Sequence, residues 1–503
     1  MPAVNITTTA AKAFEIPSGT WGYRMHNASD ETIYTLDNAA VTVATGMPLA
    51  AGAERTVCFA ERSRQPMSVQ AIHAGSGNKS LRYEILTVQL QAASRTSPSG
   101  GAGSFGSLTG VPGDNTALAA ALATKSPLVP VSTVIPVGTH CEHANDNAQS
   151  NGTDTTSTSR TRHFITCGCY DVQALLTNIY GSTSPTTNNF PITVKAAIEI
   201  NSVIYPLFIR GARTATLAAG GVVYTDPFPW QFAAGDIVFL RINVSVSSGD
   251  KWPRWAFFSN SVDTFETGAD RTDSGAFSGT NGYSYRASGL FGKPTTVNQG
   301  SVLIVGDSIA AGSGGSTWMN GFIQRSFGGD YGKEVPHVFI GASGETANNF
   351  TDQAKTIYRL GLARNCTAAL VQLGTHDIFS GRTAAQVQAN LQTIYARLRT
   401  LGINRIYQTT ITPRTTSTDS WTTVNNQTTT NVTHEAERVT LNAWIRANTA
   451  GISGFFEVAD VVESARDSGR WKAGATADGI HPTDAMHTTM AAAITTSGLL
   501  TVP

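Results

Sequence analysis

The stretch Val302–Gly315, "VLIVGDSIAAGSGG", decides the fold of the C-terminal part of the chain. Four branched apolar residues precede Gly306, Asp307 and Ser308, and mostly small residues follow. A short apolar run bounded by turn residues is typical of a buried strand. The sequence therefore predicts a strand that ends in a strand-to-helix turn, with space for another molecule to approach Ser308.

Similar apolar runs recur along residues 299–503, each separated from the next by a segment with helical periodicity. They lie at 301–305, 337–342, 368–374, 404–412 and 455–460. Two of the separating segments carry an apolar stripe on one helical face. The stripes consist of Val387, Leu391, Ile394, Leu398 and Leu401, and of Val439, Leu441, Trp444 and Ile445. Apolar strands alternating with amphipathic helices predict a parallel sheet covered by helices on both faces.

Three further segments are expected before this α/β domain. Residues 1–94 alternate short β-type runs with turn residues and predict a small β domain. Residues 95–127 form a Gly/Ser-rich linker that ends in a short Ala-rich helix. Residues 128–298 predict a β-sandwich or jelly roll. Four of its aromatic residues either stack on sugar rings or pack in the sandwich core; they are Trp230, Trp252, Trp255 and Tyr283.

The composition excludes several classes of partner. Only 14% of the residues are charged, the 35 Lys and Arg balance the 35 Asp and Glu, and no basic run occurs. We therefore expect no nucleic acid partner. No apolar run is as long as a membrane span, so we expect no membrane insertion. The N-terminus lacks the charged start and apolar centre of a secretory signal peptide.

The cysteines do not form a recognisable framework. They are five in number and scattered, at Cys58, Cys141, Cys167, Cys169 and Cys366. An odd, dispersed set argues against structural disulfides and for folding in a reducing cytoplasm. His140, Cys141 and His143 lie close together, but their spacing fits no zinc template. We therefore expect neither a metal nor another cofactor.

Polar residues that can carry chemistry follow the predicted strands. In parallel sheets such residues collect at the carboxyl ends of the strands. A serine hydrolase needs a base for the hydroxyl proton and a group that orients the base, and Asp478 and His481 offer both within one turn. It also needs preorganised N–H donors for the oxyanion, and Gly344 and His376 follow suitable strands. Ser308 is the expected nucleophile.

A second Asp-x-x-His pair, Asp484 and His487, occurs in the segment "TDAMHTTMAAAIT". This segment has the pattern of a final helix. We interpret the two residues as helix-start and packing residues.

The motifs together resemble those of the SGNH (GDSL-type) hydrolases. Four blocks occur in the family's order over roughly residues 300–503: Gly306-Asp307-Ser308, Gly344, Gly374-x-x-Asp377 and Asp478-x-x-His481. The resemblance implies a flavodoxin-like parallel sheet between helices. It also implies that Ser308 is the nucleophile and that His481 is the base oriented by Asp478. It also implies that the Ser308 and Gly344 N–H groups form part of the oxyanion hole, and that Asp307, Gly374 and Asp377 support the site.

One position departs from the family. His376 stands where the family has an asparagine that donates to the oxyanion. Imidazole still carries an N–H, so we expect His376 to take this role. Because imidazole ordinarily titrates near neutrality, we also expect His376 to mark the pH profile.

The linker adds a second resemblance. The segment "LTGVPGDNTALAAALATK" at residues 108–125 is similar to one often seen in bacteriophage tail fibres and tail spikes. SGNH domains in such proteins commonly resemble deacetylases of bacterial surface polysaccharides. The resemblance implies a virion-attached esterase, made in the host cytoplasm, that removes O-acetyl groups from capsule or O-antigen and binds other tail proteins through its N-terminal domain.

Two alternatives remain open at this stage. The departure at His376 is compatible with a receptor-binding fibre whose hydrolase domain is inactive and only binds glycan. A bacterial lipase or thioesterase unrelated to phage would act on longer acyl chains and be a monomer.

The linker region predicts a homotrimer. Leu118 and Leu122 form a stripe too narrow to stabilise a short helix alone, so residues 107–127 need partners that identical chains would supply. Light scattering of the intact chain is expected to give about three times the chain mass of 53.0 kDa. A monomer at micromolar concentration would contradict this prediction.

Overall fold

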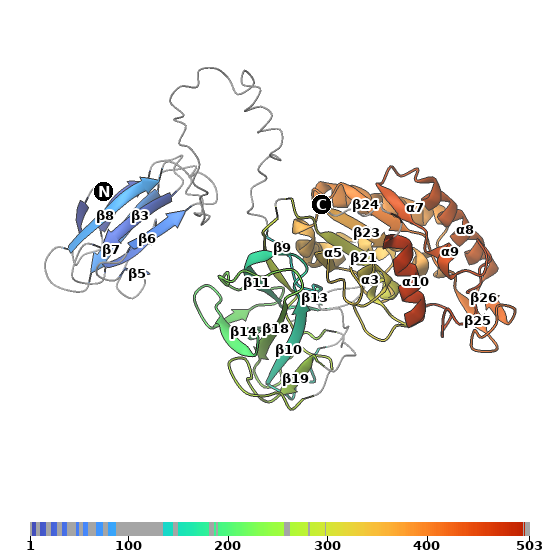
Figure 1. Ribbon diagram of the computed structural model, residues 1–503, viewed down its shortest axis with the longest axis horizontal. Coiled ribbons are helices and arrows are strands. Elements are labelled where there is room, and N and C mark those ends of the chain that lie inside the picture. The colour runs from blue at the N-terminus through green and yellow to red at the C-terminus, as the bar shows by residue number, and fades with distance from the viewer. Residues whose placement is uncertain are drawn as a thin grey trace, which may run out of the picture. The chain divides into compact units, whose positions relative to one another are not determined.

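The computed structural model places two compact units along the chain, Met1–Thr124 and Lys125–Pro503. Figure 1 shows the elements coloured along the sequence. In the first unit the structure describes the backbone of eight strands. In the second unit it describes residues 134–143, 149–180, 186–187, 190–255, 262–279, 282–296, 298–495 and 497.

The described strands of the first unit form two antiparallel sheets. One has the order β1 (Ala3–Ile6), β8 (Lys79–Leu86), β3 (Gly22–Asn27) and β6 (Glu54–Cys58), and the other β2 (Ala11–Ile16), β7 (Met67–His73), β4 (Ile33–Asp37) and β5 (Met47–Leu49). The linker and the Ala-rich helix expected at 95–127 lie outside the described residues.

Two antiparallel sheets and a small hairpin begin the second unit. The larger sheet has the order β15 (Val203–Leu207), β14 (Ile192–Ile200), β18 (Ile237–Ser245), β10 (Thr156–Phe164) and β19 (Thr264–Thr267), and β16 (Thr214–Leu217) also pairs with β14. The smaller has the order β17 (Val222–Tyr224), β11 (Cys169–Thr177), β20 (Gly289–Pro294) and β9 (Ile135–Pro136). Strands β12 (Ile179–Tyr180) and β13 (Thr186–Thr187) form the hairpin.

The two larger sheets share one apolar core. Alternate residues of β14, such as Val194 and Ile198, are buried there together with Ala174 and Leu176 of β11. This period of two is that of strands with one face in a core. Antiparallel sheets in this region are thus confirmed, and the jelly-roll connectivity stays a prediction.

The four aromatic residues singled out in this region, Trp230, Trp252, Trp255 and Tyr283, divide equally between the two interpretations. Trp252 and Trp255 are buried in the core. Trp230 and Tyr283 are 38% and 46% exposed. Only the exposed pair is available to a ligand.

The C-terminal part holds a parallel sheet of the expected kind. The strand order is β22 (His337–Phe339), β21 (Val302–Gly306), β23 (Ala368–Gln372), β24 (Arg405–Thr409) and β27 (Gly454–Phe456), and every pair is parallel. The chain starts beside the edge and then runs across the sheet in sequence order, which is the flavodoxin-like order. The predicted parallel sheet between helices is confirmed.

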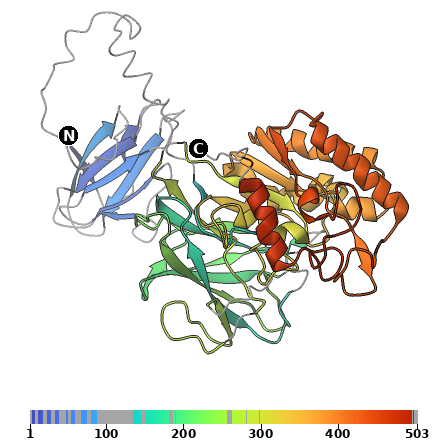
Figure 2. The ribbon, with the colours of Figure 1, turned by 45° about the vertical axis from the view of Figure 1, so that its right-hand side comes forward.

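Helices cover both faces of this sheet because its strands are apolar on both sides. In β21, Leu303 and Val305 pack in one core, and Val302 and Ile304 pack in another. The first core includes residues of α4 (Ala347–Thr351), α5 (Gln353–Leu360), η3 (Gly361–Asn365), α6 (Thr375–Phe379), α7 (Ala384–Thr400) and α8 (Val432–Ala447). The second includes residues of α2 (Ser308–Ala311), α3 (Phe322–Arg325), α9 (Ala459–Val462) and α10 (Asp484–Thr495). Figures 1 and 2 show α7 and α8 on one side of the sheet and α10 on the other.

The antiparallel part covers an open edge of the parallel sheet. The Phe339 N–H, on edge strand β22, donates to the carbonyl of Cys141 at 2.9 Å. Cys141, Leu175 and Phe291 are buried in the same apolar core as Leu303. A sheet edge that is covered in this way cannot pair with another chain. The described residues from 134 onward are therefore one packed structure.

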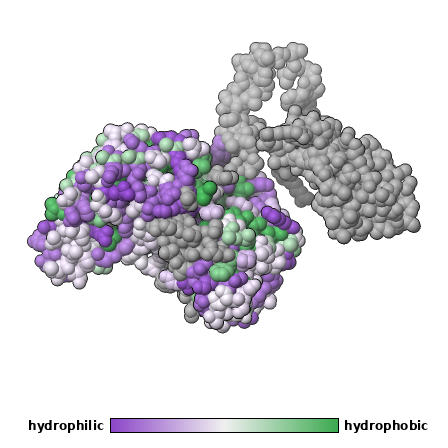
Figure 3. Space-filling view, turned by 180° about the vertical axis from the view of Figure 1, so that it is seen from behind, coloured by the Kyte–Doolittle hydropathy of each residue, from purple (hydrophilic) through white to green (hydrophobic). Residues whose placement is uncertain are grey.

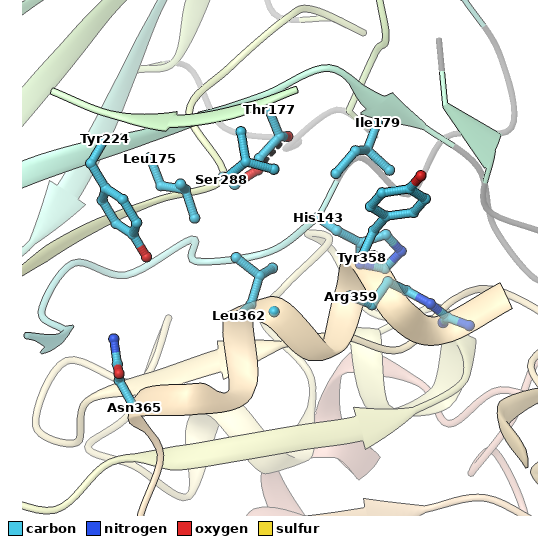
Figure 4. Close-up of a pocket in the computed structure, with 12 residues that line it drawn as sticks. His143, Leu175, Thr177, Ile179, Tyr224, Ser288, Tyr358, Arg359, Leu362 and Asn365 are labelled. Atoms are coloured by element: carbon cyan, nitrogen blue, oxygen red, sulfur yellow. Dashed lines mark hydrogen bonds between the residues drawn. The ribbon is translucent and has the colours of Figure 1, made fainter. Parts of the chain in front are cut away.

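A cavity of about 460 Å³ lies in this seam between the antiparallel strands and helix α5 with η3 (Figure 4). Leu175, Leu362 and other apolar side chains line it, and the hydroxyls of Thr177 and Ser288 bond to each other at 2.9 Å. Arg359, which also lines the cavity, is fully buried and forms an ion pair with Glu345. This buried pair connects the seam with the loop that follows β22.

The face of the molecule seen from behind is mostly polar. Seen from behind, hydrophilic and neutral residues cover most of the coloured surface, with scattered apolar patches (Figure 3). Where the structure is described, we find no helix with the length and apolarity that crossing a membrane requires.

The shared core predicts that Phe291 stabilises both parts of the second unit. Phe291 is fully buried and meets Tyr224 edge to face, with ring centroids 5.6 Å apart. Phe291→Ala is expected to lower the free energy of unfolding by about 3–5 kcal/mol, because it leaves a cavity. Phe208→Ala, at a side chain that is 42% exposed, should cost less than about 1 kcal/mol. Urea denaturation measures both; equal losses would contradict the shared core.

Candidate active site

Ser308 lies at the turn between β21 and α2, as the first residue of that helix. The Asp307 carboxylate caps the helix by accepting the Ile309 N–H at 2.8 Å. The turn is tight, since a Cβ on Gly306 would lie 2.4 Å from the Cβ of Ala310. The sequence thus fixes the position of Ser308 through a cap before it and small residues around it.

The structure brings Ser308, His481 and Asp478 into one hydrogen-bonded chain. Ser308 Oγ lies 2.8 Å from His481 Nε2, and His481 Nδ1 lies 2.6 Å from Asp478 Oδ2. Nδ1 donates to the carboxylate, so Nε2 is free to accept the serine proton. This arrangement allows the imidazole to act as a general base on the hydroxyl.

The turn that carries Asp478 and His481 is held from several sides. Asp478 Oδ1 accepts the N–H groups of Ile480 and His481 at 2.9 and 2.8 Å. Partial burial disfavours the charge of Asp478, but the hydrogen bonds from His481 and Ile480 outweigh it and lower the pKa of the carboxyl. Gly479 has φ +78°, and a Cβ there would lie 1.9 Å from the carbonyl oxygen of Thr415. The carboxylate is therefore charged and fixed in direction.

Gly314 is a residue of the site that the sequence did not single out. Its φ is +87°, and a Cβ there would lie 2.3 Å from the Pro482 carbonyl oxygen and 2.8 Å from the His481 Cβ. The loop after the nucleophile therefore packs directly against the base. The small residues after Ser308 were the available signal, but they did not reveal what approaches them.

Gly344 and His376 follow β22 and β23 at the same edge as Ser308. Gly344 has φ +71°, and its N–H makes no hydrogen bond to any described residue. His376 lies on α6, which begins after Gly374 at φ +129°. Its Nε2 is buried, lacks a hydrogen-bond partner among the described residues, and lies 4.0 Å from Asp307 Oδ2. The Gly344 N–H is thus available as a donor, and the role of His376 in the oxyanion hole stays a prediction.

The protonation state of His376 differs from the one that we expected from the sequence. Burial, followed by the positive charges of Arg414 and His481, lowers the pKa of His376 to about 4. The imidazole is therefore neutral at physiological pH and carries one N–H. The expectation that His376 marks the pH profile near neutrality is wrong, because the sequence does not show how deeply the ring is buried.

Asp377 joins the two loops that carry these donors. Its carboxylate oxygens accept the N–H groups of Ala347 and Asn348 at 2.6 and 3.1 Å, at the start of α4. Since Ala347 lies three residues after Gly344 and Asp377 follows His376, this cap fixes one loop against the other. Asp377 is a positioning residue in this arrangement.

Asp307 is fully buried beside the nucleophile. Burial raises the pKa of the Asp307 carboxyl to about 7. Hydrogen bonds with the Ile309 backbone and the Gln372 side chain act in the opposite direction. Gln372 Oε1 also accepts the Asp307 N–H at 3.2 Å. Gln372 on β23 was not found from the sequence.

The second Asp-x-x-His pair has structural contacts. Asp484 begins α10 and forms an ion pair with Arg325. His487 is fully buried, and its ring nitrogens bond to the Phe322 N–H at 3.2 Å and the Ser313 carbonyl at 3.0 Å. Neither residue is part of the hydrogen-bonded chain to Ser308. Among the described residues, no three His, Cys, Asp or Glu side chains are placed to hold a metal ion.

A serine hydroxyl, a hydrogen-bonded imidazole and an orienting carboxylate, with free N–H groups nearby, define a serine hydrolase. Residues 304–489 match the GDSL-like Lipase/Acylhydrolase family. This part of the chain is a GDSL-type acylhydrolase domain, and its activity is that of a serine esterase. No curated protein matches the chain.

Several solved structures are similar to the chain. A GDSL-like lipase from Bacteroides thetaiotaomicron has 17% identity and a TM-score of 0.28, over 39% of this chain and 86% of that chain. The lipase Lip_vut3 from a goat rumen metagenome has 11% identity and a TM-score of 0.31, over 41% and 100%. A variant of an acetyl xylan esterase from Geobacillus stearothermophilus has 16% identity and a TM-score of 0.29, over 41% and 99%.

The hydrogen-bonded chain predicts that its members act as a unit. Ser308→Ala and His481→Ala are each expected to lower kcat by about 10⁴-fold or more, and the double variant should lose little more than either. Asp478→Asn should be less severe. Steady-state kinetics on p-nitrophenyl acetate measures these losses, and additive effects or near-normal activity of Ser308→Ala would refute the assignment.

The position of His376 predicts an effect on kcat. His376→Ala is expected to lower kcat by roughly 10²–10³-fold with little change in KM, because the N–H bonds most strongly to the charged oxygen of the transition state. His376→Asn should restore much of the rate by supplying an amide N–H. Equal rates for His376→Ala and the wild type would remove His376 from the mechanism.

The buried carboxyl of Asp307 predicts a pH-dependent cost in stability. Its pKa of about 7 in the folded protein exceeds that of an exposed aspartate, so the associated stability is present at acid pH and is lost as the pH rises towards 7. Relative to Asp307→Asn, the wild type is expected to lose about 2–3 kcal/mol of unfolding free energy between about pH 5 and about pH 8. Urea denaturation at both pH values tests this, and identical pH dependence of the two proteins would contradict it.

Proposed function

We propose that the protein is a virion-associated serine esterase that removes O-acetyl groups from bacterial capsule or O-antigen polysaccharide. The observation that carries the esterase activity is the Ser308–His481–Asp478 hydrogen-bonded chain at the edge of the parallel sheet. The tail-fibre-like linker at residues 108–125 supports the virion setting and the polysaccharide substrate.

The reaction follows from the positions of these groups. Ser308 Oγ attacks the ester carbonyl carbon while its proton passes to His481 Nε2. The carbonyl oxygen gains negative charge and accepts hydrogen bonds from the Ser308, Gly344 and His376 N–H groups. His481 then protonates the departing sugar oxygen, which leaves an acetyl group on Ser308. Water, deprotonated by His481, attacks this ester; the bond between Ser308 Oγ and the acyl carbon breaks, His481 returns the proton to Oγ, and acetate is released.

The neutral state of His376 favours an active enzyme over a glycan-binding fibre with an inactive hydrolase domain. The His376 ring is neutral, and its buried Nε2 has no hydrogen-bond partner among the described residues. A residue that replaces the oxyanion-binding asparagine must have such an unpaired N–H. The remaining parts of the proposal are a homotrimer, attachment to other tail proteins through the first unit, and synthesis in the host cytoplasm.

Acetate release tests the proposed function. A panel of purified acetylated capsules and O-antigens is incubated with the wild type and with Ser308→Ala, and chemically deacetylated samples serve as blanks. We expect the wild type to release acetate from at least one polymer and Ser308→Ala to release none. Faster hydrolysis of p-nitrophenyl octanoate than of p-nitrophenyl acetate, without acetate from any polymer, would favour the lipase or thioesterase alternative.

A further inference from the structure

Arg414 lies five residues after Thr409, the last residue of β24, in the segment that follows the carboxyl end of this strand. Ser308 and His376 likewise follow the carboxyl ends of β21 and β23. The backbone of Arg414 is held beside the turn of the catalytic base, because the next residue, Thr415, donates its N–H to the Gly479 carbonyl at 3.1 Å. The sequence did not single out this arginine.

The side chain of Arg414 points towards α6, the helix that carries His376. Its guanidinium carbon lies 5.7 Å from the centre of the Phe379 ring. Phe379 lies one turn after His376 on α6, and the charge of Arg414 contributes to the low pKa of His376. The guanidinium is thus fixed near the oxyanion donor by a cation–π contact.

The guanidinium has no counter-ion within the described residues. It makes no hydrogen bond or ion pair there. The carboxylates of the site bind other groups: Asp478 bonds to His481, and Asp377 caps α4. Arg414 is half-buried, so its charge remains accessible from solvent. The site therefore has a fixed positive charge that the hydrolytic reaction does not require.

We propose that Arg414 binds a carboxylate on the substrate, so that the preferred polysaccharide carries an acidic sugar at or next to the O-acetylated unit. The flat guanidinium fork matches a carboxylate through two parallel hydrogen bonds. This proposal rests on the proposed function and adds the charge of the substrate to it. Arg414 acts in specificity and takes no part in the proton transfers.

Inhibition of p-nitrophenyl acetate hydrolysis tests the subsite without a polymer. Glucuronate and glucose differ only in the carboxylate, and glucose 6-phosphate carries a phosphate instead. Glucuronate is expected to inhibit the wild type at about tenfold lower concentration than glucose, and Arg414→Gln should abolish this difference. The control variant Arg399→Gln removes a positive charge from an exposed position on α7. It should retain the difference in inhibition between glucuronate and glucose.

Three outcomes would overturn the proposal. They are equal inhibition of the wild type by glucuronate and glucose, loss of the difference in Arg399→Gln as well, and stronger inhibition by glucose 6-phosphate than by glucuronate. The last result would assign a phosphate to the subsite.

A matched polymer pair separates this proposal from the proposed function. An acetylated capsule that contains glucuronic acid is compared before and after chemical reduction of its carboxyl groups. The wild type is expected to prefer the acidic form by about tenfold in kcat/KM, and Arg414→Gln should show no preference. Equal kcat/KM of the wild type on both forms contradicts the Arg414 proposal alone. Failure to release acetate from any capsule contradicts the proposed function, and the inhibition experiment then decides on Arg414.

Discussion

The 2.8 Å hydrogen bond between Ser308 Oγ and His481 Nε2 joins two loops that are 173 residues apart in the sequence. The rest of the catalytic part serves to bring these loops together. Parallel strands that are apolar on both faces place their carboxyl ends at one edge, where the loops meet. Gly314 and Gly479 then allow the close backbone approaches that set the distance between serine and imidazole. A side chain at either position would move the base.

Buried polar contacts hold the opposite side of the site and extend to the seam. Asp377 caps α4 and thereby fixes the Gly344 loop against the helix that carries His376. Glu345, next to Gly344, forms a fully buried ion pair with Arg359, which lines the seam cavity. Breaking such a pair leaves an uncompensated buried charge and is costly. This ion pair therefore connects the loop that contains Gly344 with the seam cavity.

The sequence predicted the features that depend on local patterns. Apolar runs and helical stripes located the parallel strands, α7 and α8, and the spacing in "DGIHP" placed Asp478 and His481 within one turn. Features that depend on long-range packing were not accessible. The contact of Cys141 with β22, the burial that lowers the pKa of His376, and the position of Arg414 each require knowledge of which distant segments meet.

The proposed mechanism requires Ser308 to be an activated nucleophile. Labelling with a p-nitrophenyl phosphonate ester, followed by peptide mass spectrometry, tests it most directly, since the reagent forms a stable bond only with an activated hydroxyl. We expect one label per chain, located on Ser308, with labelling lost in His481→Ala. A label on another residue, or labelling of Ser308 that does not depend on His481, would contradict it.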